Sequence, residues 1–288
     1  MDTFDTFQAR AWADHGADPA AVAERLGEGL ALAATDADLA SLAHLGQHVW
    51  GEHLARWDRG LSFLASISTH AAAGDAARGA VRRAEATLSL AASRADLRPT
   101  LSPSDAVRVS AVAAAAVAPR EPARATELLQ EAVAGAAQLA DADPAVRTVA
   151  ANANNLAAAL EEQPSRDDAG RALMIAAAIA ARTTWERAGT WLEVARAEMR
   201  LAKTWLAAGE PATARVHADA ALASVEAHGA GPADRLFAAE GVALAAAAAG
   251  DHEARARAVG LAEAAFAALP EDDRAWCAPT LAALPRGS

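Results

Sequence analysis

The sequence predicts an all-α protein, and three observations lead to that prediction. Hydrophobic residues make up 53% of the chain, yet aromatic residues make up only 4% and tyrosine is absent, because alanine supplies most of the apolar content. Alanine is the best helix former, whereas strands prefer β-branched and aromatic residues. Runs of alternating valine, isoleucine and threonine are missing, and turn residues recur at short, regular intervals. We therefore expect helices throughout the chain.

Turn residues set the expected helix boundaries in order along the chain. Proline and glycine end one helix at each turn, and an aspartate or serine caps the next. The turns are HGADP (15–19), AGD (73–75), RPTLSPSD (98–105), APREP (118–122), DADP (141–144), QPSRDD (163–168), AGEP (208–211), HGAGPAD (228–234) and AGD (249–251). They divide the chain into about fourteen helices, most of them about twelve to twenty residues long.

Self-similarity follows the same spacing. The segment AAAGDAARGAVRRAEA (71–86) is similar to AAAGDHEARARAVGLAEA (247–264), and each is expected to hold a helix, a Gly-Asp turn and a second helix. Comparable turns at Pro164, Gly209 and Gly250 lie 45 and 41 residues apart. Helical hairpins that return at a near-constant period are typical of an α-solenoid.

The residues around these turns follow a known repeat pattern. The order large, small, large, turn, small, large occurs as Leu156-Ala157-x-x-Leu160, Pro164, Ala169-x-x-x-Leu173, and in part as Leu201-Ala202-x-x-Trp205, Gly209, Ala214. In this order the chain resembles a tetratricopeptide-repeat protein, and NNLA with EQPSRDDA is similar to the longer repeats of kinesin light chain and related bacterial proteins. The resemblance covers about residues 36–269 and is strongest over 145–269.

The resemblance implies a right-handed α-solenoid of antiparallel helical hairpins. Residues 1–35 would form an N-terminal hairpin, 36–269 the repeats, and 270–288 a capping helix and tail, since the ends of a solenoid need polar caps. The period exceeds the 34 residues usual for the family. The family's signature Trp, Tyr and Pro positions are mostly alanine here. HEAT or armadillo repeats, which have periods of this size, are the alternative architecture.

Two sets of polar residues are the candidate binding residues. Asn152 and Asn155 share a face of one expected helix, and Arg196, Arg200 and Lys203 share a face of the equivalent helix in the next hairpin. The resemblance implies that these helices line a concave groove. There the asparagine amides would bind a peptide backbone and the cations a carboxylate.

These residues predict a scaffold that binds a protein or peptide with an acidic or carboxylate-bearing segment and catalyses no reaction. The Lys and Asn that chaperone-tail clamps of this family carry one repeat earlier are missing from residues 108–118, so general binding of acidic peptides is the expectation. One alternative is a solvated face in which Arg196 and Arg200 pair with Glu193 or Glu198. A second alternative is a ligand- or peptide-sensing regulatory module that acts on a separate output protein.

A histidine-rich segment, AHLGQHVWGEH (43–53), is the weaker candidate for a site. His44, His48 and Glu52 recur every four residues on one helical face, with His53 adjacent, and two imidazoles with a carboxylate could bind zinc. The pattern is not HExxH, and Ser41 and Gln47 are expected on the same polar side. A polar stripe is therefore the favoured interpretation, and neither a metal nor another cofactor is expected.

Other features bear on partners and location. The net charge of −11 and the pI of about 5.2 argue against nucleic acids and anionic membranes, which bind through Lys and Arg. No motif of a hydrolase, P-loop or dinucleotide site is present, and the lone Cys277 has no evident histidine partner. The apolar runs are too short to span a bilayer, so a cytoplasmic protein is expected. The Ala and Arg excess indicates a bacterial source, and a homodimer is compatible with the Ala-rich ends.

Overall fold

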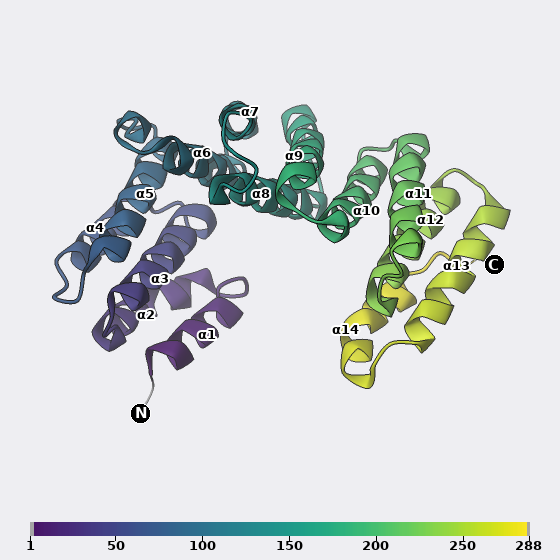
Figure 1. Ribbon diagram of the computed structural model, residues 1–288, viewed down its shortest axis with the longest axis horizontal. Coiled ribbons are helices and arrows are strands. Elements are labelled where there is room, and N and C mark those ends of the chain that lie inside the picture. The colour runs from purple at the N-terminus through teal and green to yellow at the C-terminus, as the bar shows by residue number, and fades with distance from the viewer. Residues whose placement is uncertain (1–2, 287–288) are drawn as a thin grey trace. The chain divides into compact units, whose positions relative to one another are not determined.

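The computed structural model describes residues 3–286, and this range is all-α, as predicted. It holds fourteen α-helices and no strand. The chain divides into two compact units between Leu139 and Ala140, where the sequence pattern had predicted no boundary. Figure 1 labels the helices in chain order, with the first unit in purple to teal and the second in teal to yellow.

The first unit contains seven α-helices and two short irregular turns of helix. They are α1 (Phe4–Asp14), α2 (Pro19–Leu32), α3 (Asp36–Gln47), a π-helix η1 (His48–His53), α4 (Trp57–Ser68), α5 (Asp75–Ala91), a 3₁₀ turn η2 (Arg98–Thr100), α6 (Pro103–Val117) and α7 (Pro122–Ala136). Helix α3 packs against α5 rather than only against its chain neighbours, and α6 pairs with α7.

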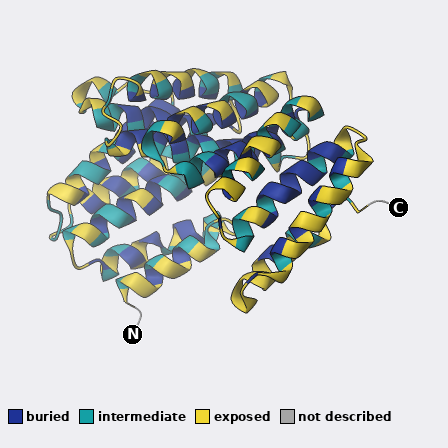
Figure 2. Cartoon of the chain, turned by 45° about the vertical axis from the view of Figure 1, so that its right-hand side comes forward, coloured by how far each residue is buried: buried dark blue, intermediate teal, exposed yellow. Residues whose placement is uncertain are grey.

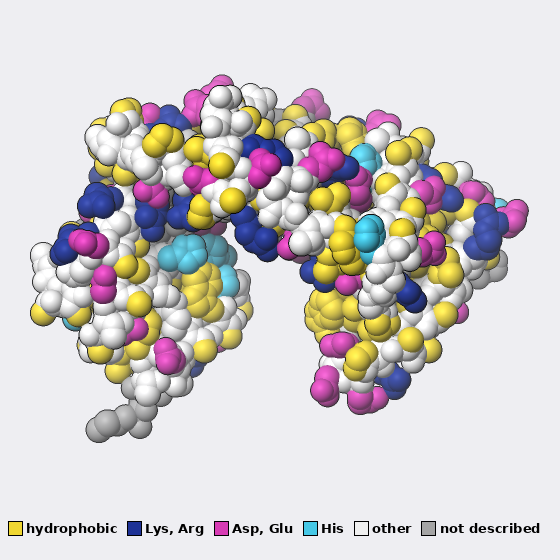
Figure 3. All heavy atoms as spheres, viewed as in Figure 1, with side chains coloured by type: hydrophobic (Ala, Val, Ile, Leu, Met, Phe, Trp, Pro, Cys, Tyr) yellow, Lys and Arg dark blue, Asp and Glu magenta, His cyan; other side chains and the backbone are white. Residues whose placement is uncertain are grey.

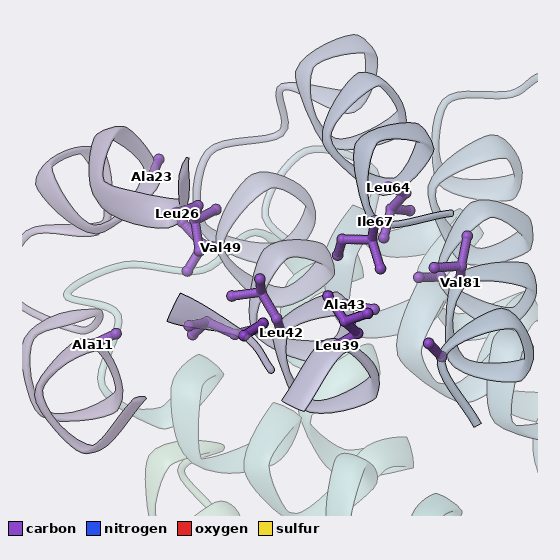
Figure 4. Close-up of a cluster of buried hydrophobic side chains, with 14 of the residues drawn as sticks. Ala11, Ala23, Leu26, Leu39, Leu42, Ala43, Val49, Leu64, Ile67 and Val81 are labelled. Carbon is purple, nitrogen blue, oxygen red and sulfur yellow. The ribbon is translucent and has the colours of Figure 1, made fainter. Parts of the chain in front are cut away.

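Helix α3 forms the centre of the first unit's hydrophobic core. Leu39, Leu42 and Leu45 have no exposed surface, and side chains from α2, α4 and α5 close around them. Figure 4 shows this cluster, with the labelled side chains pointing between the helices. Trp12, Trp50 and Trp57 pack at its margin, half-buried. These tryptophans serve as packing anchors.

A carboxylate of α3 caps the neighbouring helix α5. Asp36 accepts backbone N–H groups from Gly74 at 2.7 Å, Ala77 at 2.9 Å and Ala76 at 2.9 Å. The bond from Ala77, with the others, holds the pKa of Asp36 below its ordinary value. A Cβ on Gly74 would lie 2.5 Å from Asp36 Oδ2, so glycine is what lets the carboxylate approach.

The prediction of a helix directly before the Gly-Asp turn at residues 73–75 is wrong. Helix α4 ends at Ser68, and residues 69–74 form turns and irregular backbone that lead directly into α5. The similarity between 71–86 and 247–264 therefore holds for the turn and the second helix only. Asp36 supplies the cap that a regular hairpin would obtain from its own turn.

The second unit is more regular. Its helices are α8 (Pro144–Glu161), α9 (Asp168–Ala188), α10 (Trp191–Ala207), α11 (Pro211–Ala227), α12 (Pro232–Ala248), α13 (His252–Ala267) and α14 (Glu271–Ala282). The pairs α8/α9, α10/α11 and α12/α13 form hairpins whose first helices begin 47 and 41 residues apart. The predicted antiparallel hairpins are confirmed here. Figure 2 shows buried residues recurring along the helices as dark blue patches that alternate with exposed yellow ones.

Two glycines end helices as the turn pattern predicts. Gly209 has φ +80° and Gly250 has φ +74°, a left-handed conformation that side chains disfavour. The N–H of the residue after each glycine donates to a carbonyl of the preceding helix, Trp205 and Ala246 respectively, at 2.9 Å. These hydrogen bonds satisfy carbonyl groups in the last turns of α10 and α12, which would otherwise lack a partner within the helix.

The last helix covers the end of the second unit. Cys277 of α14 is fully buried among Leu236 of α12, Ala262 of α13 and Leu269. These contacts shield apolar side chains that the α12/α13 hairpin would otherwise expose. None of the helices in residues 3–286 is both long and apolar enough to cross a membrane.

Candidate functional site

Helix α10 carries a row of charged side chains on one face. Glu193, Arg196, Arg200 and Lys203 recur at spacings of three and four residues, and all four lie within the helix. The shared face predicted for the three cations is therefore present. Helices α8 and α12 flank α10, so each side of this row faces another first helix of a hairpin.

Each cation of this row pairs with a carboxylate from a flanking helix. Arg196 donates through Nε and Nη2 to Asp234 of α12, at 2.8 and 3.3 Å. Lys203 Nζ lies 2.9 Å from Glu240 of α12. The alternative in which Arg196 pairs with Glu193 or Glu198 is wrong about the partner, because α12 brings Asp234 into contact with Arg196.

Arg200 pairs in the opposite direction, toward α8. Its Nη1 lies 2.5 Å from Glu161 Oε2, and the hydroxyl of Thr204 donates to Glu161 Oε1 at 2.5 Å. Glu161 is the last residue of α8, and Thr204 is fully buried. The pairing of Arg200 with Glu193 or Glu198 is likewise wrong.

In each of these pairs the carboxylate lies deeper than the cation. The Arg196 side chain is 58% exposed and that of Asp234 16%, while Lys203 is 35% exposed and Glu240 9%. Arg200 at 27% and Glu161 at 11% follow the same order. We call the residues of these pairs, together with Arg147 and Glu193, the α8–α10–α12 surface. This surface has as many carboxylates as cations, but its cations are the more exposed of the two.

Arg147 of α8 completes the surface. Its Nη2 lies 3.1 Å from Glu193 Oε1, and its guanidinium lies 4.9 Å from the centre of the Trp185 ring. Glu193 also forms a capping box at the start of α10. It accepts the Thr190 hydroxyl at 2.6 Å and the Thr190 backbone N–H at 2.9 Å. These bonds, chiefly the one from the hydroxyl, lower the pKa of Glu193 to about 2.

We expect Glu193→Gln to lower the free energy of unfolding by about 1 kcal/mol at pH 7, because the charged cap is lost. The folded state lowers the pKa of Glu193, so its contribution is present above the ordinary value of 4.5 and is lost as pH falls toward 2. Urea unfolding between pH 7 and pH 3 should therefore show the two proteins converging. Glu253→Gln, at an 87% exposed carboxylate, is the control. A difference as large at pH 3 as at pH 7 would contradict the prediction.

The three asparagines of α8 take different roles. Asn154 lies seven residues from both Arg147 and Glu161 and so shares their stripe. Asn155 is exposed, and its Oδ1 is 3.4 Å from Asn154 Nδ2. Asn152 donates to the carbonyl of Thr148 in its own helix at 2.9 Å. Of the two predicted groove asparagines, Asn155 offers an exposed amide, whereas the Asn152 amide is used within the helix.

A second polar cluster joins the opposite side of α10 to its neighbours. Glu198, only 8% exposed, accepts from Arg182 Nε of α9 at 2.7 Å and lies 2.6 Å from His217 Nδ1 of α11. A buried carboxylate needs such partners. This cluster positions α10 within the unit and does not extend the α8–α10–α12 surface.

Aromatic side chains form two contacts in the same unit, and the sequence pattern did not single them out as a set. Trp191, the first residue of α10, stacks on His228 with ring centres 4.4 Å apart. Phe237 of α12 meets Trp276 of α14 edge-on at 5.1 Å, and Trp276 is 66% exposed. Tryptophan is enriched among the residues that contribute most to binding between proteins.

Histidines gather in the first unit, though not in the predicted set. One ring nitrogen from each of His15, His48 and His53 lies within 4.8 Å of the others. Glu52 contacts His48 Nδ1 at 3.0 Å, while His44 packs against the Trp12 ring at 5.4 Å. Figure 3 shows histidine side chains in one cyan patch beside hydrophobic side chains in this unit.

The π-helix explains why the helical spacing left His53 beside the predicted set and not in it. In an α-helix, residues five apart point in different directions, but the wider π turn places His53 Nε2 3.1 Å from His48 Nε2. Gln47, expected on the polar side, is buried and donates to Glu52 at 3.2 Å. The pKa of His53 is lowered by partial desolvation of its ring and then by His48 and His15.

No protein-family model matches the chain, and no curated protein is significantly similar to it. Chemically, the α8–α10–α12 surface offers several guanidinium groups and an ammonium group within reach of solvent. The first unit offers a set of converging imidazoles.

Proposed function

We propose that the chain is a helical-repeat scaffold, similar to tetratricopeptide proteins, that binds an acidic segment of another protein on the α8–α10–α12 surface. It would carry out no reaction of its own. The observation that carries the proposal is the unequal exposure within the ion pairs. In all four pairs described for this surface the cation is more exposed than its carboxylate, including Arg147 at 59% against Glu193 at 24%.

The donors of these cations support binding of further carboxylates. A guanidinium has five N–H donors, and Asp234 engages only Nε and Nη2 of Arg196. Glu193 engages Nη2 of Arg147. These partly buried carboxylates thus fix the orientation of the arginines without using all their donors. A pre-oriented arginine loses little side-chain entropy when it binds a second carboxylate.

The aromatic residues of the same unit support an extended partner. Trp276, with its largely exposed ring, and Trp191 provide apolar contacts. Charged contacts tend to set orientation and association rate, whereas aromatic anchors supply more of the affinity. An acidic segment with a hydrophobic residue would satisfy both kinds of contact.

The test uses labelled peptides and fluorescence anisotropy. The probes are glutamate-rich peptides with a hydrophobic residue and a free carboxyl terminus, and neutral versions in which glutamine replaces glutamate and the terminus is amidated. The test variant is Arg147→Gln/Arg196→Gln, because glutamine can still donate to Glu193 and Asp234. The control is Arg257→Gln/Arg274→Gln, which removes the same charge from exposed i,i+4 and i,i+3 pairs on α13 and α14.

We expect the acidic peptides to bind the native protein and the neutral peptides to bind it weakly. The test variant should bind at least tenfold more weakly, since losing about 1.4 kcal/mol of charge-assisted contact changes affinity tenfold. Binding should also weaken as salt is raised. Equal affinity of the test and control variants would refute the proposal, as would equal binding of acidic and neutral peptides.

A further inference from the structure

The histidine cluster of the first unit has the donors of a metal site. His15 follows the end of α1, and His48 and His53 are the first and last residues of η1. We propose that His15, His48 and His53 together bind one divalent transition metal ion through their imidazole nitrogens, with zinc as the reference ion. This inference concerns the first unit and does not depend on peptide binding by the second.

The hydrogen bonds around the cluster fix which nitrogens are available. His15 Nδ1 lies 2.6 Å from the carbonyl oxygen of Trp12, and His48 Nδ1 lies 3.0 Å from a carboxylate oxygen of Glu52. Both partners only accept hydrogen bonds, so both Nδ1 atoms carry the proton and both Nε2 atoms present a lone pair. An imidazole held by a carbonyl or carboxylate through its other nitrogen is the usual arrangement at metal sites.

The separations suit a small ion. Zinc binds imidazole nitrogen at about 2.0–2.1 Å, so two nitrogens of a tetrahedral site lie about 3.3 Å apart. His48 Nε2 and His53 Nε2 are already 3.1 Å apart. The three nitrogens all lie within 4.8 Å of one another, so the wider separations would have to shorten by at most about 1.5 Å when the ion binds.

Binding requires a change of tautomer at one ring. Without metal, the Nε2–H group of His53 donates a hydrogen bond to His48 Nε2, because His48 carries its proton on Nδ1 and has none on Nε2. With metal, His53 would carry its proton on Nδ1 and leave Nε2 as a ligand. No proton is gained or lost in this exchange. His53 is exposed, so water can occupy the remaining coordination position.

The ligand set indicates both the class of ion and its role. Imidazole ligands suit zinc, copper, nickel and iron, whereas calcium and magnesium prefer oxygen. An ion here would join the end of α1 to η1. Because it binds the folded state, it would stabilise the packing of the N-terminal helix.

The test is a titration of the untagged full-length protein with zinc by isothermal calorimetry, since a polyhistidine tag would bind the ion itself. We expect one zinc per chain. His53→Ala and His15→Ala should each lower the affinity at least tenfold. Glu52→Gln should lower it about tenfold, since outer partners of ligating histidines typically contribute ten- to a hundredfold.

His44→Ala is the matched control, because it removes a neighbouring histidine that contacts the same tryptophan but lies outside the set. The zinc affinity of His44→Ala should remain within about twofold of the zinc affinity of the native protein, because His44 is not a ligand. Zinc should also raise the melting temperature of the native protein and of His44→Ala, but not that of His53→Ala. Circular dichroism of the metal-free variants checks that each is folded. Absence of stoichiometric binding, unchanged affinity in His15→Ala and His53→Ala, or an equal loss in His44→Ala would overturn the proposal.

Discussion

Replacing Glu161 with alanine should lower the free energy of unfolding by about 2–3 kcal/mol, since it leaves a partly buried cation without its partner. Glu161 is 11% exposed and Arg200 27%. Arg200 Nε has no hydrogen-bond partner among the described residues, so the guanidinium depends on Glu161. The hydroxyl of the buried Thr204 would lose its acceptor as well. The expected loss is smaller than for a fully buried pair because water can reach Arg200.

Urea unfolding at pH 7 measures this effect through a lower midpoint at unchanged slope. Glu162→Ala changes the adjacent, exposed glutamate and should shift stability by less than about 0.5 kcal/mol. The double variant Glu161→Ala/Arg200→Met removes the unpaired charge and should recover part of the loss. If Glu161→Ala were no more destabilising than Glu162→Ala, the ion pairs would have no role in holding α8 against α10.

Leu42→Ala should lower the free energy of unfolding by about 3 kcal/mol, because it opens a cavity in the first unit's core. Leu42 has no exposed surface and lies on α3, the helix around which the other apolar side chains gather (Figure 4). Neighbouring helices of a close-packed core relax only partly into the space. The loss therefore includes both the transfer free energy of the side chain and the cost of the cavity.

Thermal and urea unfolding of Leu42→Ala can be compared with two further variants. Leu42→Met keeps most of the side-chain volume and should cost less than about 1.5 kcal/mol. Leu261→Ala truncates a leucine that is 47% exposed and should cost less than Leu42→Ala. Equal losses in Leu42→Ala and Leu261→Ala would mean that α3 is not the centre of the core.

Local features of the chain were predicted well where they depend on neighbours in sequence. The turns at Gly209 and Gly250 follow from the freedom of glycine at positive φ, and Asp167 and Asp251 cap helices as expected. The row of Arg196, Arg200 and Lys203 follows from helical spacing alone. The histidine set was predicted less well, because its pattern assumed a regular α-helix through residues 44–52, where a π-helix begins at His48.

By itself, the sequence determined that the protein is all-α, where most of its helices begin and end, and which charges share a face of α10. These features depend on alanine content, on capping residues and on the helical period of about 3.6 residues per turn. Each of these is read from residues that are close together in the sequence. Only the tertiary structure decided which charges meet. Asp234 and Glu161 lie 38 and 39 residues from their arginines, and His15 lies far from His48 in sequence. Contacts over such separations depend on how helices pack, and an alanine-rich interface leaves few sequence signals of that packing.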